Sequence, residues 1–408
     1  MKKLILLVIV AIILPGLHAQ DKEYLTPWQE GYMDIHIIST GKGEANYFIF
    51  PDGTSMLIDC GDSGYKWKQR VLPNDSKTAA GWVAAYINHF GKNVPRPGRL
   101  DYFLLSHFHH DHMGQKATML EGKKYGLCGI TNLTEFVKIG KWVDRGYPRY
   151  DYPSEKHCYS VTGGFLTEYK ACIEHQKKKN KTKVEGFVVG SNEQFVLNNA
   201  PEKFDFEVRN LAANGMTWTG VGLETKDNAG GPQNISDENV CSCAIKISYG
   251  KFSYYTGGDL LGGCYGLSEK PQKKNWDFET PMSEVCGPVT AMRINHHSAV
   301  NSTNPRILRN LRPKTIFISS ARFTQPNYTT LFRILDPMIW KGEREVFCNL
   351  DAAKNDVPEE FYKYIKAIGH LVLRVYDGGE SYQVFVLDNK DATYPIIYKS
   401  ELKDSKPQ

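Results

Sequence analysis

The densest group of chemically active side chains lies between residues 106 and 114, which read Ser-His-Phe-His-His-Asp-His-Met-Gly. Zinc prefers imidazole nitrogen and carboxylate oxygen as ligands, and alternate residues of an extended segment point to the same side. His107 and His109 can therefore bind one ion together. So many imidazole and acidic groups would be costly to bury without a cation. The segment predicts a metal site.

Asp111 and His112 fall where we expect the chain to turn into a helix, so they can face a second ion. A His-rich surface loop is the alternative interpretation. The motif, however, directly follows Leu100–Leu105, a continuous apolar run that is typical of a strand buried on both faces. Ligand sites in α/β folds lie at the ends of such strands. We also expect Asp111 to orient an attacking water.

Four later or earlier positions could complete such a site. Asp259 follows an apolar segment and could bridge two ions, although a turn-forming role is the alternative. His296 and His297 follow another apolar segment, and neighbouring residues of a strand point in opposite directions. We therefore expect one of them to be a ligand, with His297 preferred, and His296 to support a ligand or contact the substrate. Asp59 also ends a predicted strand, where it could orient a ligand histidine or simply form a turn.

Apolar segments of strand and helix spacing surround these residues. We predict strands at 33–39, 46–50, 55–59, 100–105, 204–211, 240–249, 252–256, 289–294, 315–319, 345–348, 371–376 and 383–387. We predict helices at 78–91, 165–176, 329–335 and 358–368. Residues 120–200 are less regular and are interpreted as an insertion or lid, in which the basic run 177–183 forms a solvated turn.

The first twenty residues have the pattern of a signal peptide, with Lys2 and Lys3, an apolar run, and the small Ala19. This predicts a secreted or periplasmic protein with no transmembrane segment after cleavage; an uncleaved anchor is the alternative. We expect one domain over residues 21–400 and a polar tail at 401–408. The formal charge of +5 falls to +3 without the two leader lysines, which gives no support for nucleic acid as a partner.

The motifs, taken in order, resemble the metallo-β-lactamase superfamily and, within it, the hydrolase-like domain of the DNA-uptake competence protein ComEC. Residues 36–45 are similar to the opening "GxGxA/S" segment, and 57–61 to "LIDxG". Residues 106–114 resemble "THxHxDHxGG", 239–243 "NxxS", 256–259 "TGD", and 296–299 "HHGS". Gln115 and Ser298 replace family glycines. No third family histidine can be placed between 112 and 259, where His157 and His175 lie in the insertion.

The resemblance implies an αββα sandwich: two mixed sheets face to face, with helices on the outer faces. It also implies a metal-dependent hydrolase with one or two zinc ions, manganese and iron being alternatives. His107 and His109 would hold one ion, and Asp111, His112 and His297 the other, with Asp259 bridging. The expected substrate is a small or polymeric phosphodiester. A carboxylic ester, amide or lactam hydrolase is one alternative, and a non-catalytic binding protein on the same scaffold is another.

Overall fold

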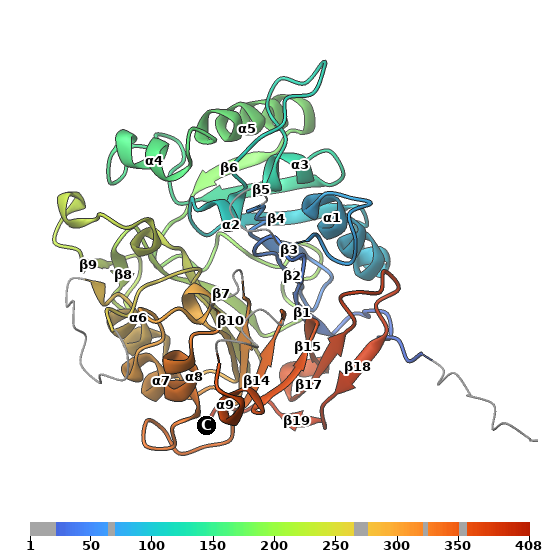
Figure 1. The fold of residues 1–408 in the computed structure, drawn as a ribbon, viewed down its shortest axis with the longest axis vertical. Helices are drawn as coiled ribbons and strands as arrows, with labels where there is room; N and C mark the ends of the chain where they lie inside the picture. Colours follow the sequence, from blue (N-terminus) through green and yellow to red (C-terminus); the bar gives the residue numbers. More distant parts are fainter. Residues whose placement is uncertain (1–21, 64–69, 265–275, 321–324, 351–356) are drawn as a thin grey trace, which may run out of the picture.

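Two β-sheets lie face to face in a computed structural model of the chain, and helices cover the outer side of each sheet (Figure 1). The structure describes residues 22–63, 70–264, 276–320, 325–350 and 357–408. The predicted signal peptide lies outside the described residues. The four layers are those of an αββα sandwich, so the predicted fold class is confirmed.

The first sheet has the strand order β18-β17-β16-β1-β2-β3-β4-β5-β6, with β19 paired to β17. It is mixed, because β3 to β6 run parallel and the other neighbours run antiparallel. Its strands are β1 Met33–Ile37, β2 Asn46–Ile49, β3 Ser55–Ile58, β4 Arg99–Leu105, β5 Lys138–Asp144, β6 Lys183–Gly186, β16 His370–Val375, β17 Ser381–Leu387, β18 Ile396–Lys399 and β19 Lys403–Asp404.

The second sheet has the order β15-β14-β13-β12-β11-β10-β7-β8-β9. Its strands β11 to β15 run parallel, and the others pair antiparallel. Its members are β7 Phe206–Ala213, β8 Met216–Trp218, β9 Thr225–Asp227, β10 Ala244–Tyr249, β11 Phe252–Thr256, β12 Ala291–Arg293, β13 Thr315–Ile318, β14 Glu345–Cys348 and β15 Ile365–Ile368.

The helices lie in two outer layers. Those on the first sheet are α1 Ala79–Phe90, α2 His110–Met113, α3 Gly129–Leu133, α4 Glu155–Val161 and α5 Leu166–Asn180. Those on the second are α6 Glu279–Cys286, α7 Pro305–Leu311, α8 Tyr328–Leu335 and α9 Glu359–Tyr362. The short 3-10 helices are η1 Gly91–Asn93, η2 Pro232–Asn234, η3 Glu238–Cys241, η5 Asn295–Ser298 and η6 Asp377–Gly379.

Three hydrophobic clusters fill the spaces between these layers. The central cluster joins the inner faces of both sheets, with Leu104 of β4 and Tyr254 of β11 among its members. Phe103, the neighbour of Leu104, belongs to the cluster beneath α1, α3 and α5. A third cluster packs α6, α7 and α8 on the second sheet. The alternation explains why β4 is apolar throughout: each of its faces meets a different core.

Three sequence predictions differ from the structure. The basic run 177–183, predicted as a solvated turn, forms the last turn of α5 and the start of β6. The predicted helix at 358–368 stops at Tyr362, and Ile365–Ile368 forms strand β15, because β14 offers an open parallel edge whose backbone groups need partners. In the predicted strand 240–249, the first residues belong to η3 and pairing starts at Ala244. The region interpreted as an insertion adds β5 and β6 to the edge of the first sheet, with α3 to α5 over them.

All nine cysteines lie among the described residues, each a buried free thiol. Within the described ranges, no helix is both long and apolar enough to cross a membrane.

Candidate metal centre

The predicted metal motif lies where β4 leaves the first sheet and enters α2. β4 ends at Leu105, and α2 spans His110–Met113. The loop after β3 holds this turn through backbone hydrogen bonds, from Cys60 N to His112 O at 2.9 Å and from Asp62 N to His110 O at 3.1 Å. A Cβ atom on Gly61 would lie 1.8 Å from Asp111 O, so only glycine allows this approach.

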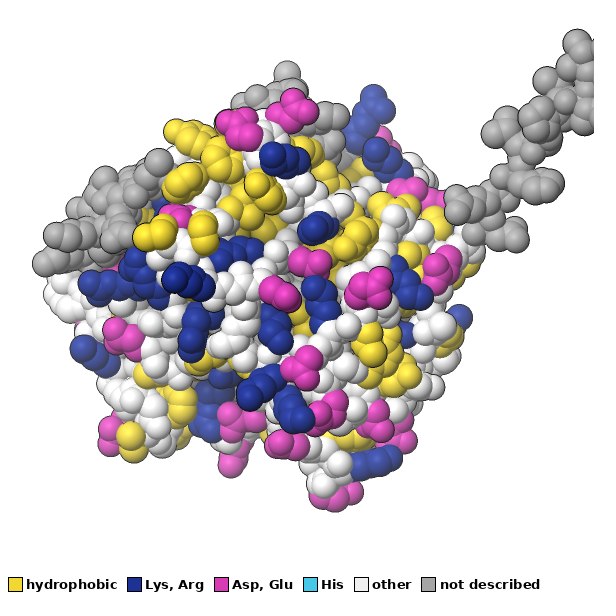
Figure 2. Space-filling view, turned by 90° about the horizontal axis from the view of Figure 1, so that it is seen from below, with side chains coloured by type: hydrophobic (Ala, Val, Ile, Leu, Met, Phe, Trp, Pro, Cys, Tyr) yellow, Lys and Arg dark blue, Asp and Glu magenta, His cyan; other side chains and the backbone are white. Residues whose placement is uncertain are grey.

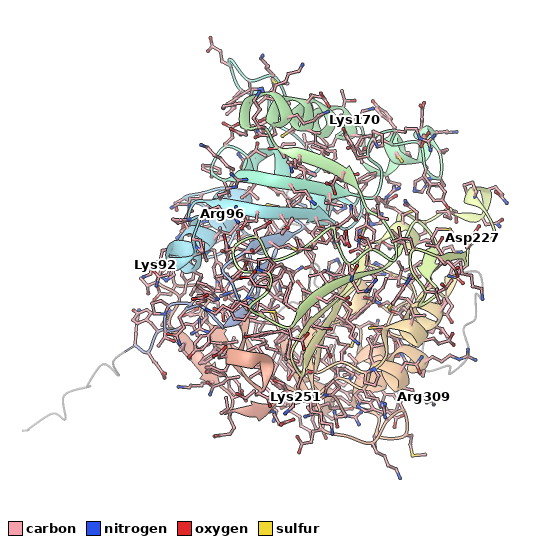
Figure 3. The ribbon with its side chains drawn as sticks, turned by 180° about the vertical axis from the view of Figure 1, so that it is seen from behind. Lys92, Arg96, Lys170, Asp227, Lys251 and Arg309 are labelled. Atoms are coloured by element: carbon pink, nitrogen blue, oxygen red, sulfur yellow. The ribbon has the colours of Figure 1, made fainter. Side chains whose placement is uncertain are left out.

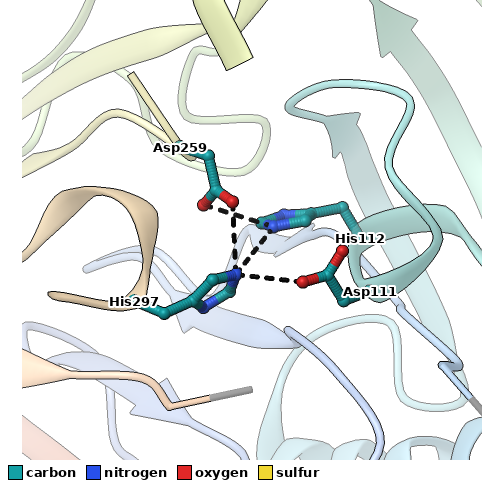
Figure 4. Close-up of side chains that lie close together, drawn as sticks. All are labelled: Asp111, His112, Asp259 and His297. Atoms are coloured by element: carbon teal, nitrogen blue, oxygen red, sulfur yellow. Dashed lines mark hydrogen bonds and ion pairs between the residues drawn. The ribbon is translucent and has the colours of Figure 1, made fainter. Parts of the chain in front are cut away.

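Four predicted ligands meet in one buried group, which we name the Asp111 cluster: Asp111, His112, Asp259 and His297 (Figure 4). The Nε2 atom of His297 lies 3.2 Å from Asp111 Oδ2, 3.2 Å from Asp259 Oδ2 and 3.2 Å from His112 Nε2. His112 Nε2 lies 3.3 Å from Asp259 Oδ1. Donor atoms about 3.3 Å apart suit a tetrahedral ion with bonds of about 2.0–2.2 Å.

The hydrogen bonds at Nδ1 fix which nitrogen of each imidazole faces this cluster. His297 Nδ1 lies 2.7 Å from the carbonyl oxygen of Ser319, which can only accept, so Nδ1 carries the proton. His112 Nδ1 donates to Asp59 Oδ2 at 2.7 Å. When both rings are neutral, two Nε2 lone pairs face each other across 3.2 Å, and a proton or a metal ion between them relieves this opposition. The donor set fits a divalent metal.

The charges of the cluster point the same way. Burial disfavours the cationic form of His112, but Asp259 and Asp59 outweigh it and raise the pKa of His112 to about 10. Burial also lowers the pKa of His297, but Asp259 and Asp111 outweigh it and raise that pKa well above its usual range. Asp259 Oδ1 is buried and has no hydrogen-bond partner among the described residues. The buried carboxylates are thus stabilised by positive charge beside them, and either protons on the imidazoles or metal ions can supply it.

The other predicted ligands form the His107 cluster: His107, His109 and Asp259. His107 Nε2 lies 3.0 Å from His109 Nδ1 and 3.8 Å from Asp259 Oδ2. Ser106 Oγ lies 2.7 Å from Asp59 Oδ2 and 3.1 Å from His107 Nδ1, so it can accept from His107 while it donates to Asp59. Burial is the main reason that the pKa of His107 lies well below its usual value. The two clusters share Asp259.

Asp59 contacts two of the predicted ligand histidines, His112 directly and His107 through Ser106. Its Oδ2 atom accepts from His112 Nδ1 and from Ser106 Oγ, and its Oδ1 atom accepts from Ser106 N at 2.7 Å. This carboxylate lies behind both clusters, one imidazole directly and the other through a hydroxyl.

The argument from strand alternation fails for His296 and His297. They lie in η5, and His296, His297 and Ser298 have left-handed backbone angles, with φ of 47°, 52° and 64°. Such angles are strained for residues other than glycine and concentrate at functional sites. Both imidazoles turn toward Asp259: His296 Nε2 lies 3.9 Å from Asp259 Oδ2, compared with 3.2 Å for His297. His296 is also the more exposed, with 18% of its side chain accessible against 1%.

Glu44 and Arg293 are functional residues that the sequence did not single out. Glu44 Oε1 lies 2.9 Å from His297 Nδ1 and forms an ion pair with Arg293. Arg293 also donates to the carbonyl of Gly258, next to Asp259, and its guanidinium lies 3.6 Å from Asp259 Oδ1. These buried groups orient His297 and Asp259. The only sequence signal was the position of Glu44 in the turn after the first strand.

Glu238 does the same for the other cluster. It is buried, and its Oε1 atom accepts from the backbone N–H of Phe108 at 2.8 Å, between the two ligand histidines in sequence. Arg145 donates to both of its oxygens at 2.7 and 2.5 Å, and His157 Nε2 lies 3.0 Å from Oε2. Glu238 thus connects Arg145 and His157 of the insertion with the backbone of the metal motif. His157 lies outside both clusters, and His175 packs against Tyr125.

Comparisons with known proteins add little to this picture. No protein-family model matches the chain, and no curated protein matches its sequence. Among solved structures, it is similar to CmlA, a diiron β-hydroxylase from Streptomyces venezuelae, with 16% identity, TM-score 0.36, and coverage of 74% of this chain and 47% of CmlA. The chain thus spans about half of CmlA.

It is also similar to Zn²⁺-bound PqqB from Methylobacterium extorquens, with 10% identity, TM-score 0.34 and coverage of 70% and 88% of the two chains. A third similar structure, from Thermotoga maritima, is described as a Zn-dependent hydrolase of the metallo-β-lactamase superfamily, with 9% identity, TM-score 0.28 and coverage of 78% and 97%. Because these scores are low, we base the fold assignment on the strand order and layers of the chain itself.

Proposed function

We propose that this protein is a metal-dependent hydrolase that cleaves phosphodiesters at a centre of two divalent cations, zinc being the first choice. One observation carries the proposal: the carboxylate of Asp259 belongs to two adjacent donor clusters at once. A carboxylate shared in this way can bridge two ions. Centres with two ions about 3.5–4 Å apart favour displacement at phosphorus, because they stabilise both the attacking and the leaving oxygen.

Two bound cations would polarise a phosphoryl oxygen and lower the pKa of a water to near 7. The side chains divide the remaining work. Asp111 has a pKa well below its usual range, because His297 and His112 outweigh the effect of burial, so its carboxylate stays ionised and can orient the attacking water. His296, the more exposed imidazole, faces Asp259 from the open side and can contact the substrate.

Asn239 and Asn301 hold the imidazole of His296 in place. His296 Nδ1 lies 2.8 Å from Asn301 Oδ1, and Nε2 lies 3.3 Å from Asn239 Nδ2. Both partners come from loops beside the site, Asn239 from η3. A substrate contact made by His296 would therefore be made by a ring of fixed orientation.

The test combines metal analysis with hydrolysis of bis(p-nitrophenyl) phosphate. We expect two zinc ions per chain after reconstitution, and turnover that a chelator abolishes. His109→Ala should remove one ion, and Asp111→Ala should lower turnover by about 10³-fold. Unchanged metal content and turnover in both variants would overturn the proposal. Nitrocefin, a lactam, should not be hydrolysed; its hydrolysis in place of the diester would favour the lactamase alternative.

We also propose that the protein is exported, on the basis of the leader pattern in residues 1–20. Cell fractionation together with N-terminal sequencing of the mature chain tests this. A mature chain that still begins at Met1 in the cytoplasmic fraction would refute export without affecting the proposed chemistry.

A further inference from the structure

A hollow in the insertion, which we name the insertion pocket, lies between α4, α5 and the loop that follows β5. Its volume is about 430 Å³. The side chains that matter to its chemistry are Arg149, Tyr150, Glu155, Lys156, Tyr159 and Lys170. Three cationic groups from three separate segments therefore meet around one hollow that contains a single carboxylate.

Several exposed lysines of this chain are paired with a carboxylate. Lys22, Lys203 and Lys251 each form an ion pair with a carboxylate at 2.5–2.6 Å. Neither Lys156 nor Lys170 has such a partner in the part of the chain that the structure describes; the recorded neighbour of Lys170 is the ring of Tyr150, 5.3 Å from its Nζ. Their charge is therefore available to an anion.

One residue that lines the pocket, Tyr150, packs near the metal motif. The ring of Tyr150 lies 6.0 Å from that of Phe108, which separates the ligands His107 and His109 in sequence. On α4, Lys156 lines the pocket, while its neighbour His157 reaches Glu238, the carboxylate that holds the Phe108 backbone. The short helix α4 thus contacts both the insertion pocket and the residue that holds the metal motif.

The strand directions exclude the long basic run 177–183 from this arrangement. β4, β5 and β6 are parallel, with Leu105 beside Asp144 and Asp144 beside Gly186, so their carboxyl ends share the edge that bears the metal motif. Lys183 begins β6 at the opposite edge. Lys178 lies eight residues beyond Lys170 on α5, about 12 Å along the helix. Only the beginning of α5 is near the site.

Among the described residues, the far end of the molecule mixes charges of both signs. Figure 2, seen from below, shows Lys and Arg side chains interspersed with Asp and Glu over that face. Figure 3 shows Lys170 at the end of the molecule opposite Lys251 and Arg309. The insertion, residues 120–200, contains thirteen Lys and Arg against nine Asp and Glu, a difference of +4 out of the +5 of the whole chain. The positive charge is thus concentrated in the insertion.

We propose that the insertion pocket binds a second phosphate group of the substrate, next to the phosphodiester that is cleaved. This inference rests on the proposed function, since it names the substrate class of the same site. It predicts a preference for substrates that carry at least two phosphates. Because these cations are exposed, the preference should weaken as ionic strength rises.

The test uses two substrates that differ by one phosphate: the p-nitrophenyl ester of thymidine 5′-monophosphate, with and without a 3′-phosphate. We expect KM to be about fivefold lower for the form with the extra phosphate at low salt. In the double variant Lys156→Glu/Lys170→Glu this advantage should vanish, while kcat and the KM of the other ester change less than about twofold. Lys178→Glu, an exposed lysine of the same helix, should keep the advantage.

Equilibrium binding separates this inference from the proposed function. Titration calorimetry with thymidine 3′,5′-bisphosphate and thymidine 5′-monophosphate should show tighter binding of the bisphosphate, and the double variant should lose that difference. If neither ester is hydrolysed but the bisphosphate still binds more tightly, the proposed function is wrong and the proposal that the pocket binds a phosphate is retained. If the double variant binds or hydrolyses the bisphosphate form as well as the parent does, the pocket proposal is wrong.

Discussion

The two donor clusters that share Asp259 are held by the protein to different degrees. In the Asp111 cluster, His112 and His297 each have their second nitrogen fixed by a buried group, Asp59 in one case and the carbonyl of Ser319 in the other. In the His107 cluster, His107 is held through the hydroxyl of Ser106. The half-buried imidazole of His109 contacts His107 itself.

This difference indicates a division of roles. A cluster whose ligands are already oriented loses little entropy when it binds an ion. The Asp111 cluster should therefore bind its ion with higher affinity than the His107 cluster. The His107 cluster depends on the backbone around Phe108, which Glu238 ties to the insertion. Its ion should be weaker and should respond to changes in the insertion. The insertion would then affect both the metal content and the proposed second phosphate contact.

The largest effect should come from Asp259→Asn, which breaks the group common to both clusters. Loss of this charge removes the bridge and leaves His112 and His297 with one carboxylate fewer. We expect diester turnover to fall by about 10³-fold or more, and zinc content to drop below one ion per chain by mass spectrometry of the metal-loaded protein. Two ions retained at normal affinity would show that the clusters are independent.

The second-largest effect should come from Asp59→Asn, which weakens the Asp111 cluster. The amide can donate where the carboxylate only accepted, so the Nδ1 proton of His112 is no longer fixed. We expect the affinity for the tighter ion to fall by about 10- to 100-fold, measured by competition with a chromophoric chelator. Asp151→Asn, an exposed position in the insertion, is the control. A loss confined to the weaker ion would reverse the proposed order of the two clusters.

Glu238→Gln should loosen only the His107 cluster. The neutral amide keeps the shape but loses the charge that Arg145 and the Phe108 N–H engage, so we expect the affinity for the weaker ion to fall by about tenfold, with the tighter ion unchanged. Zinc titration at limiting metal gives both constants. Glu135→Gln, an exposed residue of the same insertion, should match the parent. An equal loss at both ions would mean that Glu238 supports the fold in general.

The smallest effect concerns stability and the turn that carries His297. Glu279 of α6 accepts from Asn295, at 2.9 Å, and from the backbone N–H of Thr303, at 2.6 Å, so it holds this turn from behind. Burial is the main cause that raises the pKa of Glu279 to about 7, against the lowering effect of these hydrogen bonds. A carboxyl group whose pKa is higher in the folded state than in the unfolded state stabilises the fold only while it is protonated. Its contribution is therefore complete below about pH 4.5 and is lost as the pH rises through 7.

We therefore expect this group to contribute a decrease on the order of 2 kcal/mol in the free energy of unfolding between pH 5 and pH 8. Urea unfolding of the parent and of Glu279→Gln at each pH isolates this contribution, because other titrating groups cancel in the difference. The difference between the two proteins should change by that amount across the interval. A constant difference would show that Glu279 is ionised throughout and that its role is only to accept hydrogen bonds.

The strands and the layered fold were largely predictable because their signals are local. β4, β11 and β13 are short apolar runs, and pairing places them in the core where such runs have to lie. β5 and β6 were missed because Lys138–Asp144 and Lys183–Gly186 are partly exposed at a sheet edge and carry charged residues. The sequence predicts a helix at 365–368, because the pairing of this segment with β14 is not visible in its own residues.

The metal motif at His107–His112 was determined by the sequence, because its ligands are close together in the chain and their spacing alone brings them to one side of a turn. Two features depended on the tertiary structure. Glu44, Arg293 and Glu238 lie far apart in sequence, and only the packing of the two sheets brings their charges to the ligands. The left-handed turn at His296–Ser298 decides that both imidazoles face Asp259, since that backbone geometry is held by surrounding contacts and not by local preference.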